Sequence, residues 1–325
     1  MTLLFYLPLL IPALAAVAAR PLAARLEPRT ATWLLTVATA ALAVCSTAAL
    51  ALLAASAAAR VPLLATLGHY SPHALRAGDP VSAWAGLLAA IALTGTAVAV
   101  AVAFRRRARA LAESFRRAGR LPADGSVVVL PGPAIEAYAL PGWPGRIVVS
   151  GRLLSELDDD GRAALLAHER AHLAARHHLF AAVAYLSAAA NPLLLPLARA
   201  VDYTVERWAD ERAARVTGDR RLVAVTIGRV ALLTTAVSTR TRPGGPGGHS
   251  FPAVAFGIIR PVRGRISVAW AGPVPRRVAA LLGPPPRDRA VLLAAVALVV
   301  VLAGASALEA ARDLHALLEL AQSAR

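Results

Sequence analysis

Four long apolar runs constrain the fold of this sequence more than any other feature. A helix needs about 20 apolar residues to cross the hydrocarbon core of a bilayer. The runs occupy residues 3–19, 33–59, 82–104 and 290–308, and none of them contains a charged side chain. The sequence therefore predicts a polytopic α-helical membrane protein with four spanning helices.

The chain is strongly basic. Its net charge is +16, and arginine supplies all 35 positive charges because the chain contains no lysine. Such a charge can serve nucleic-acid binding, or it can mark arginine-rich loops on the cytoplasmic side of a membrane, which the apolar runs favour. We therefore expect contact with the lipid bilayer and no direct nucleic-acid binding. The single cysteine, Cys45, excludes a disulfide framework and a cysteine-based metal site.

The distribution of arginine indicates the orientation of the chain. Residues 20–32 and 104–120 are rich in arginine, whereas residues 60–81 contain two arginines and one aspartate. Because arginine-rich segments stay in the cytoplasm, we expect the N-terminus outside, in a bacterial cytoplasmic membrane. The predicted domains are three spanning helices in 1–104, a cytoplasmic domain at 105–289, a spanning helix at 290–308 and a short extracytoplasmic tail at 309–325.

The central region carries the signals of a small α+β domain. Short runs rich in β-branched or aromatic residues at 126–130, 135–140 and 145–150 predict a small sheet. Residues 153–179 predict one helix with acidic residues clustered near its start. The remaining predicted elements are helices at about 202–216 and 221–238 and a flexible, glycine- and proline-rich loop at 239–250.

Residues 168–172 carry the strongest chemical signal, the pattern His-Glu-x-x-His. On a helix, positions i and i+4 share one face, so the imidazoles of His168 and His172 can reach one metal ion. Glu169 lies beside the first ligand and can take a proton from a water molecule that zinc activates. Alone, the pattern also fits a helix that carries histidines near a membrane interface.

A third ligand is expected, because catalytic zinc sites usually take three protein ligands and keep the fourth position open. Glu206 lies in the next predicted helix, and Asp210 follows it by one turn on the same face. We assign Glu206 as the third ligand. Asp210 is then the carboxylate that orients a ligand histidine through its other ring nitrogen. The alternative for both residues is a solvated, salt-bridged helix face.

Three segments together resemble membrane-embedded gluzincin metallopeptidases. They are GRIVVSGRLLSEL at 145–157, LLAHERAH at 165–172 and ERWAD at 206–210. Three spans before the domain, with RRVAALLGPPP at 276–286 ahead of the last span, look most like the BlaR/MecR type. The HtpX/CAAX-prenyl-protease type is a close relative.

The resemblance implies a cytoplasmic, gluzincin-like α+β zinc peptidase domain built from a small sheet and the H-E-x-x-H helix. It implies that His168, His172 and Glu206 hold one zinc ion per chain and that Glu169 is the catalytic acid/base. Antibiotic-sensing members acylate through an S-x-x-K motif in an extracellular domain. This chain has no lysine, so we expect the protease part alone, without the penicillin sensor.

Residues 179–200 are apolar enough to suggest a further span. One full crossing would place Glu206 on the opposite side of the membrane from His168 and His172. We therefore expect a core helix or a re-entrant hairpin, broken near Asn191-Pro192-Leu193, because proline interrupts helices.

Other residues carry weaker signals. The strand residues Tyr138, Ala139 and Leu140 are candidates to pair with an extended substrate, although ordinary sheet packing explains them equally well. The adjacent His177 and His178 are interpreted as interfacial or packing side chains. The remaining expectations are a solvated His249, a gating role for the 239–250 loop that contains it, and a core position for Trp208.

The predicted function is a membrane-bound zinc endopeptidase that cleaves a protein substrate at or near the cytoplasmic membrane face. The resemblance suggests a regulatory substrate such as a transcriptional repressor, and hence a role in signal transduction. One alternative is an HtpX-like quality-control protease for membrane proteins. The other is a non-enzymatic membrane sensor or scaffold, against which the glutamate beside the first histidine argues.

Overall fold

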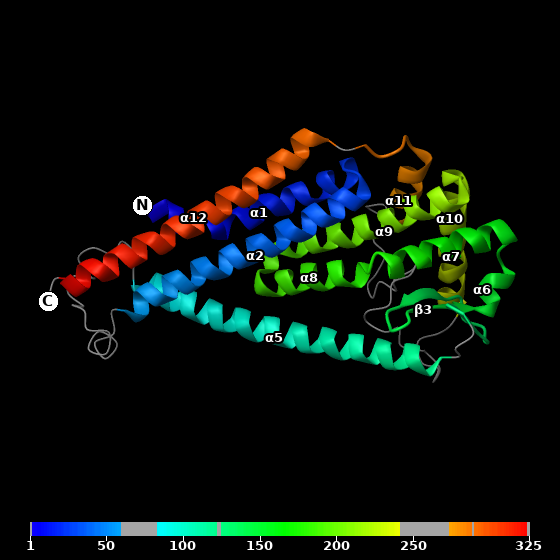
Figure 1. Ribbon diagram of the computed structural model, residues 1–325, viewed down its shortest axis with the longest axis horizontal. Helices are drawn as coiled ribbons and strands as arrows, with labels where there is room; N and C mark the ends of the chain where they lie inside the picture. Colours follow the sequence, from blue (N-terminus) through cyan, green and yellow to red (C-terminus); the bar gives the residue numbers. More distant parts are fainter. Residues whose placement is uncertain (1, 60–82, 122–124, 241–272, 288, 324–325) are drawn as a thin grey trace.

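The computed structural model describes residues 2–59, 83–121, 125–240, 273–287 and 289–323. It is an elongated bundle of long helices with a small α+β domain at one end (Figure 1). Both chain termini lie at the opposite end of the bundle. The predicted 60–81 loop and most of the predicted 239–250 loop, with His249, lie outside the described residues.

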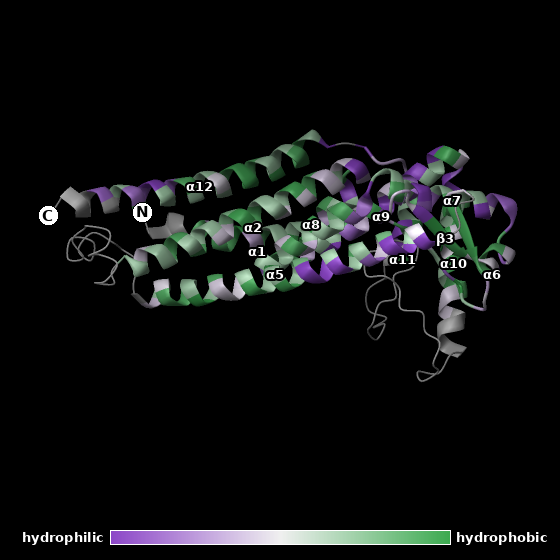
Figure 2. Ribbon diagram, turned by 60° about the horizontal axis from the view of Figure 1, so that its bottom comes forward, coloured by the Kyte–Doolittle hydropathy of each residue, from purple (hydrophilic) through white to green (hydrophobic). Residues whose placement is uncertain are grey.

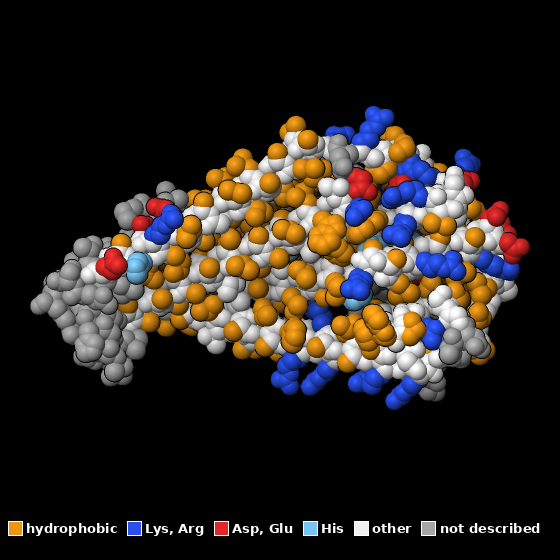
Figure 3. All heavy atoms as spheres, in the orientation of Figure 1, with side chains coloured by type: hydrophobic (Ala, Val, Ile, Leu, Met, Phe, Trp, Pro, Cys, Tyr) orange, Lys and Arg blue, Asp and Glu red, His pale blue; other side chains and the backbone are white. Residues whose placement is uncertain are grey.

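Four helices are long and apolar enough to cross a membrane, which confirms the predicted multi-pass fold. They are α1 (Thr2–Arg25), α2 (Pro28–Ala58), α5 (Ala83–Arg120) and α12 (Ala290–Ser323). Figure 2 shows their hydrophobic residues along the bundle, and Figure 3 shows apolar side chains covering its surface. In water such a surface would be costly, so this part of the molecule faces lipid.

All four helices are longer than the predicted spans, and α5 and α12 extend furthest beyond them. The 38 residues of α5 correspond to about 57 Å of helix, whereas the hydrocarbon core is about 30 Å thick. The part of α5 beyond residue 104 therefore projects from the membrane as a basic helix that reaches the α+β domain. Helix α12 likewise continues past residue 308 to Ser323.

The sheet has three short strands, as predicted. They are β1 (Val127–Leu130), β2 (Ala137–Leu140) and β3 (Arg146–Ser150), in the order β1-β3-β2. The central strand β3 is buried at every position and runs parallel to β1 and antiparallel to β2. This order leaves β2 at an edge of the sheet.

The prediction of one continuous helix over 153–179 is wrong. The segment forms α6 (Gly151–Ser155), α7 (Asp159–Ala174) and the start of α8 (His177–Ala190). The side chain of Asp158 accepts a hydrogen bond from the Gly161 N–H and starts a new helix there. Arg176 ends α7 with a left-handed backbone, φ 50°. Helices α10 (Arg220–Arg240) and α11 (Pro273–Leu282) also belong to the domain.

Residues 179–200 form the predicted break and do not cross the bundle. Helix α8 ends at Ala190 and is followed by Asn191, a short 3-10 turn covers Pro192–Leu194, and α9 (Leu195–Thr217) returns toward the domain. The side chain of Asn191 accepts a hydrogen bond from the Leu193 N–H and donates one to Ser46 Oγ of α2. The α8–α9 hairpin therefore brings Glu206 back to the side of His168 and His172.

Helix α9 belongs to two hydrophobic cores. One core joins the hairpin to α1 and α2 through residues such as Leu35, Phe180 and Val201. The other fills the α+β domain, where Ala213 of α9 packs with residues such as Leu165. Because one rigid helix spans both cores, the spanning helices hold the catalytic domain in a fixed position.

Candidate metal centre

Helices α7 and α9 bring three metal-ligand side chains together. The Nε2 atoms of His168 and His172 on α7 lie 3.1 Å apart. Each lies 3.7 Å from a carboxylate oxygen of Glu206 on α9. The three ligand atoms all lie within 4.8 Å of one another, and both histidines are buried.

These distances fit a zinc ion. Ligand atoms about 2.1 Å from zinc in a tetrahedron lie about 3.4 Å apart, close to the observed separations. Oε1 of Glu206 is buried and makes no hydrogen bond within the described residues, so it is available as a ligand. Two histidines and one glutamate are a donor set of catalytic zinc sites. His168, His172 and Glu206 therefore form the zinc-binding site, as the sequence predicted.

Glu169 lies on α7 next to the first ligand and is completely buried. Burial lowers the pKa of the nearby Arg277 guanidinium, but the charges of Asp210, Glu206 and, less strongly, Glu169 outweigh burial and raise it. The sequence predicts that this carboxylate is the proton acceptor for the attacking water.

Asp210 and Arg277 form a charged layer behind the ligands. Oδ1 of Asp210 lies 3.0 Å from Nδ1 of His168, on the side of the ring away from the metal position. Arg277 of α11 donates two hydrogen bonds to Asp210, at 2.8 and 2.6 Å, and Nη1 lies 2.8 Å from Oε2 of Glu206. One buried guanidinium thus holds two carboxylates in place.

Sequence reasoning missed this role of Arg277. It noted the Arg276-Arg277 pair only as part of the segment 276–286 that resembles the BlaR/MecR type. The two adjacent arginines have no local signal that tells them apart. In the structure, Arg276 stacks over the ring of Tyr203, with 4.3 Å between its Cζ and the ring centroid.

Burial and charge have opposite effects on the pKa values of the zinc-free site. Burial alone would lower the pKa of His168, but the carboxylates of Asp210 and Glu206 more than offset it and raise that pKa to about 9. Burial dominates at His172 and holds its pKa well below the usual value. Burial alone would raise the pKa of each carboxyl group, but Arg277 outweighs it and both pKa values fall to about 2. The carboxylates are therefore ionised, and zinc must displace a proton from His168.

His177 is buried and packs against Trp208, so the packing alternative of its prediction holds, and it also contacts the second ligand, which was not predicted. Its Nδ1 is 3.0 Å from Nδ1 of His172, and burial lowers its pKa to about 3, so the ring is neutral. With Nε2 of His172 directed at the metal, the Nδ1–H of His172 donates to His177. The broken helix explains the difference, because Arg176 turns the chain and returns His177 to this face.

The other predicted residues lie as follows. Tyr138, Ala139 and Leu140 are on the edge strand β2, and α7 packs against this strand. Trp208 is in the core, as expected, with its ring centroid 4.7 Å from that of His177.

The zinc ligands, together with four apolar spans, define a membrane zinc metallopeptidase. Residues 101–185 match the model of Peptidase family M48, so this segment is similar to that family. The matched segment contains the sheet and α7, whereas Glu206 lies beyond it. Comparison with curated proteins and with solved structures found no match.

Proposed function

We propose that this protein is an endopeptidase that cleaves a protein substrate at or near the cytoplasmic face of the membrane. The observation that carries the proposal is the convergence of His168, His172 and Glu206, with Glu169 buried beside the first ligand. A purely structural zinc site has no use for a carboxylate in that place.

Each side chain of the site has a role in this proposal. Zinc held by His168, His172 and Glu206 would supply a Lewis acid for the scissile carbonyl and would make water more acidic. Glu169 takes a proton from the attacking water and delivers it to the leaving amine. Asp210 fixes the orientation of His168 through Nδ1, and His177 fixes that of His172 in the same way.

Strand β2 offers a place for the substrate backbone. Among the described residues β3 is its only strand partner, and α7 packs against it. An extended peptide that adds to an exposed strand edge gains main-chain hydrogen bonds without a demand on its sequence. Tyr138, Ala139 and Leu140 are the residues we assign to this contact.

The proposed orientation places residues 105–289 in the cytoplasm. Its support is the basic part of α5, which lies at the domain end of the bundle and carries several arginines beyond residue 104. Arginine-rich segments next to a span stay in the cytoplasm. Substrates would then be cytoplasmic proteins or the cytoplasmic parts of membrane proteins.

Two classes of substrate follow from different observations. Resemblance to the BlaR/MecR type favours a regulatory protein such as a transcriptional repressor, and hence signal transduction. The M48 match favours the second candidate, an HtpX-like protease that removes misfolded membrane proteins. Both candidate functions use the same chemistry, so the identity of the substrate distinguishes them.

The test of peptidase chemistry compares wild type with Glu169→Gln in detergent-purified protein. We expect both forms to bind about one zinc per chain, since Glu169 is not a ligand. Cleavage of an unstructured protein such as casein should fall about 100-fold or more in the variant. Equal turnover by both forms would show that the activity does not come from this site.

The substrate test compares cells that express wild type with cells that express Glu169→Gln. A regulatory role predicts that one or a few soluble proteins are cut only with the wild type. A quality-control role predicts that many damaged membrane proteins accumulate with the variant. N-terminal proteomics of both fractions separates the two outcomes.

A further inference from the structure

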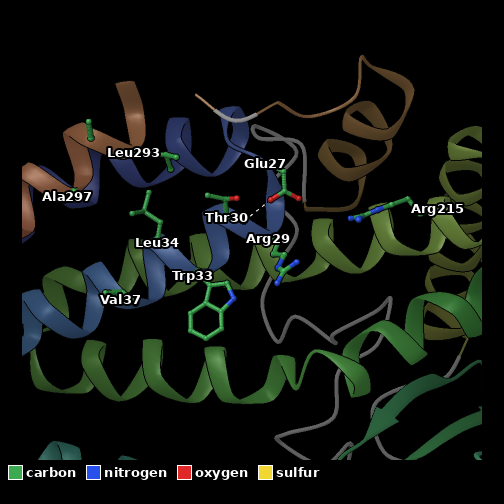
Figure 4. Close-up of a pocket in the computed structure, with 10 residues that line it drawn as sticks. Glu27, Arg29, Thr30, Trp33, Leu34, Val37, Arg215, Leu293 and Ala297 are labelled. Carbon is green, nitrogen blue, oxygen red and sulfur yellow. Dashed lines mark hydrogen bonds between the residues drawn. The ribbon is translucent and has the colours of Figure 1, made fainter. Parts of the chain in front are cut away.

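We propose that a groove between α2, α9 and α12 binds an anionic phospholipid. The groove has a volume of about 910 Å³ and is open to the surroundings. Figure 4 shows charged side chains gathered at one end and aliphatic side chains at the other. Its lining residues are Glu27, Arg29, Thr30, Trp33, Leu34, Val37, Arg215, Leu293, Ala294 and Ala297.

The groove lies where a phospholipid headgroup would be. It is built from the first turns of α2 and α12, which both begin at the domain end of the bundle. Trp33 is 54% exposed, and tryptophan is enriched at the level of the headgroups. The hollow therefore reaches from the membrane surface into the upper acyl region.

The charged end suits a phosphate group. Within the described residues, neither Arg29 nor Arg215 forms an ion pair, and both side chains are exposed. The Nε of Arg215 donates to a backbone carbonyl of its own helix, which leaves its terminal nitrogens for a ligand. Glu27 accepts a hydrogen bond from the Thr30 N–H and so caps α2. Basic pockets between spanning helices are sites for anionic headgroups.

The apolar end suits an acyl chain. Leu34 and Val37 are one helical turn apart on α2 and form one wall. Ala294 and Ala297 of α12 form the facing wall, and their small side chains leave the space between the two helices open. A lipid with its phosphate near the arginines would lay a chain along these residues.

The polar end is also close to the metal site. The guanidinium carbon of Arg29 lies 5.8 Å from the ring centroid of Trp208, which in turn packs on His177. Only the side chains of Arg29 and Trp208 would then separate a bound headgroup from His177, which contacts the zinc ligand His172.

The test measures lipid retention by native mass spectrometry. Purified protein is incubated with vesicles of equal phosphatidylglycerol and phosphatidylcholine and then re-extracted. We expect about one phosphatidylglycerol per wild-type chain and about 30-fold weaker retention by Arg29→Gln/Arg215→Gln. The control Arg105→Gln/Arg106→Gln removes two exposed arginines of α5 and should retain the lipid.

A second pair of variants tests the apolar end. Ala297→Trp fills the groove and should lose the lipid, whereas Ala295→Trp, also on α12 but outside the groove lining, should keep it. Zinc content verifies the fold of every variant. The proposal is overturned if both arginine pairs lose lipid equally, if phosphatidylcholine is retained as well as phosphatidylglycerol, or if a peptide occupies the groove instead.

Discussion

Arg277 is the side chain on which the charge balance of the metal site depends most. It is buried, and it faces the carboxylates of Glu206 and Asp210 with Glu169 nearby. Zinc would bring two further positive charges to the same carboxylates. The arginine therefore matters most for the zinc-free protein, in which it is the main cation that compensates them.

We predict that Arg277→Gln destabilises the zinc-free protein by about 3–5 kcal/mol, because it leaves buried carboxylates without their partner. Zinc should recover more stability in this variant than in wild type, since the ion replaces the missing charge. Thermal unfolding in detergent, with chelator and with zinc, measures both effects. Arg276→Gln is the matched control, because Arg276 stacks on Tyr203 and touches neither carboxylate. A zinc-dependent shift no larger than that of wild type would contradict the charge argument.

We predict that zinc affinity rises about tenfold per pH unit between about pH 6 and pH 8, because binding displaces one proton. That proton is on His168, whose pKa is raised to about 9 in the zinc-free site. His172 is already neutral and the carboxylates are already ionised in this range. The rise should level off above about pH 9.

Competition with a fluorescent chelator at each pH measures this slope. Asp210→Asn removes the main carboxylate that raises the pKa of His168, so its slope should be smaller. A flat profile in wild type would show that the zinc-free His168 is not protonated. A rise in zinc affinity of about 100-fold per pH unit would show that a second group also releases a proton.

The zinc ligands were predictable from sequence, whereas their supporting residues were not. His168 and His172 are one turn apart, and Glu206 and Asp210 repeat this spacing, so local periodicity finds them. Arg277 comes from α11, distant in sequence, and only the packing of α11 on α9 selects it over its neighbour. His177 depends on one left-handed residue, Arg176, which no glycine or proline marks.

At the scale of elements, the α8–α9 hairpin decides whether the metal site can exist. The sequence predicted a break near Asn191 by elimination, because a crossing would separate the three ligands. The structure adds the physical reason for the turn. The Asn191 side chain accepts a hydrogen bond from the Leu193 N–H and donates one to Ser46 of α2. The polar groups at the tip of the hairpin therefore have partners inside an apolar bundle.

We predict that Asn191→Ala destabilises the protein by about 1–2 kcal/mol, because the Leu193 N–H loses its cap in an environment without water. Zinc affinity should fall with it, since the hairpin positions Glu206. Ser187→Ala is the control, because in the part of the chain that the structure describes the Ser187 hydroxyl donates to a carbonyl of its own helix and to no other group. Thermal unfolding and zinc titration compare the two. Equal losses of stability would show that the cap has no special role.

At the scale of the whole molecule, the bundle has its termini at one end and its catalytic domain at the other (Figure 1). Four crossings of one membrane require this arrangement. The arginine-rich part of α5 lies at the domain end, which predicts that this end is cytoplasmic. Caps and packing determine the strand and helix boundaries of the domain. The side of the membrane on which the domain lies is inferred from charge alone.

We predict that the catalytic domain is shielded from reagents outside the cell. Cys45→Ala leaves a chain without cysteine. A single cysteine introduced into this background then shows on which side of the membrane its position lies. Glu319→Cys, on the exposed far end of α12, should react with a membrane-impermeant thiol reagent in intact cells. Arg116→Cys, on the exposed basic part of α5, should react only after permeabilisation.

The reverse labelling pattern would place the catalytic site outside and exclude cytoplasmic substrates. Labelling of both positions in intact cells would contradict a fixed orientation. Either result would leave the zinc site intact, because its ligands all lie at one end of the bundle. The experiment therefore tests the compartment of the substrate independently of the chemistry.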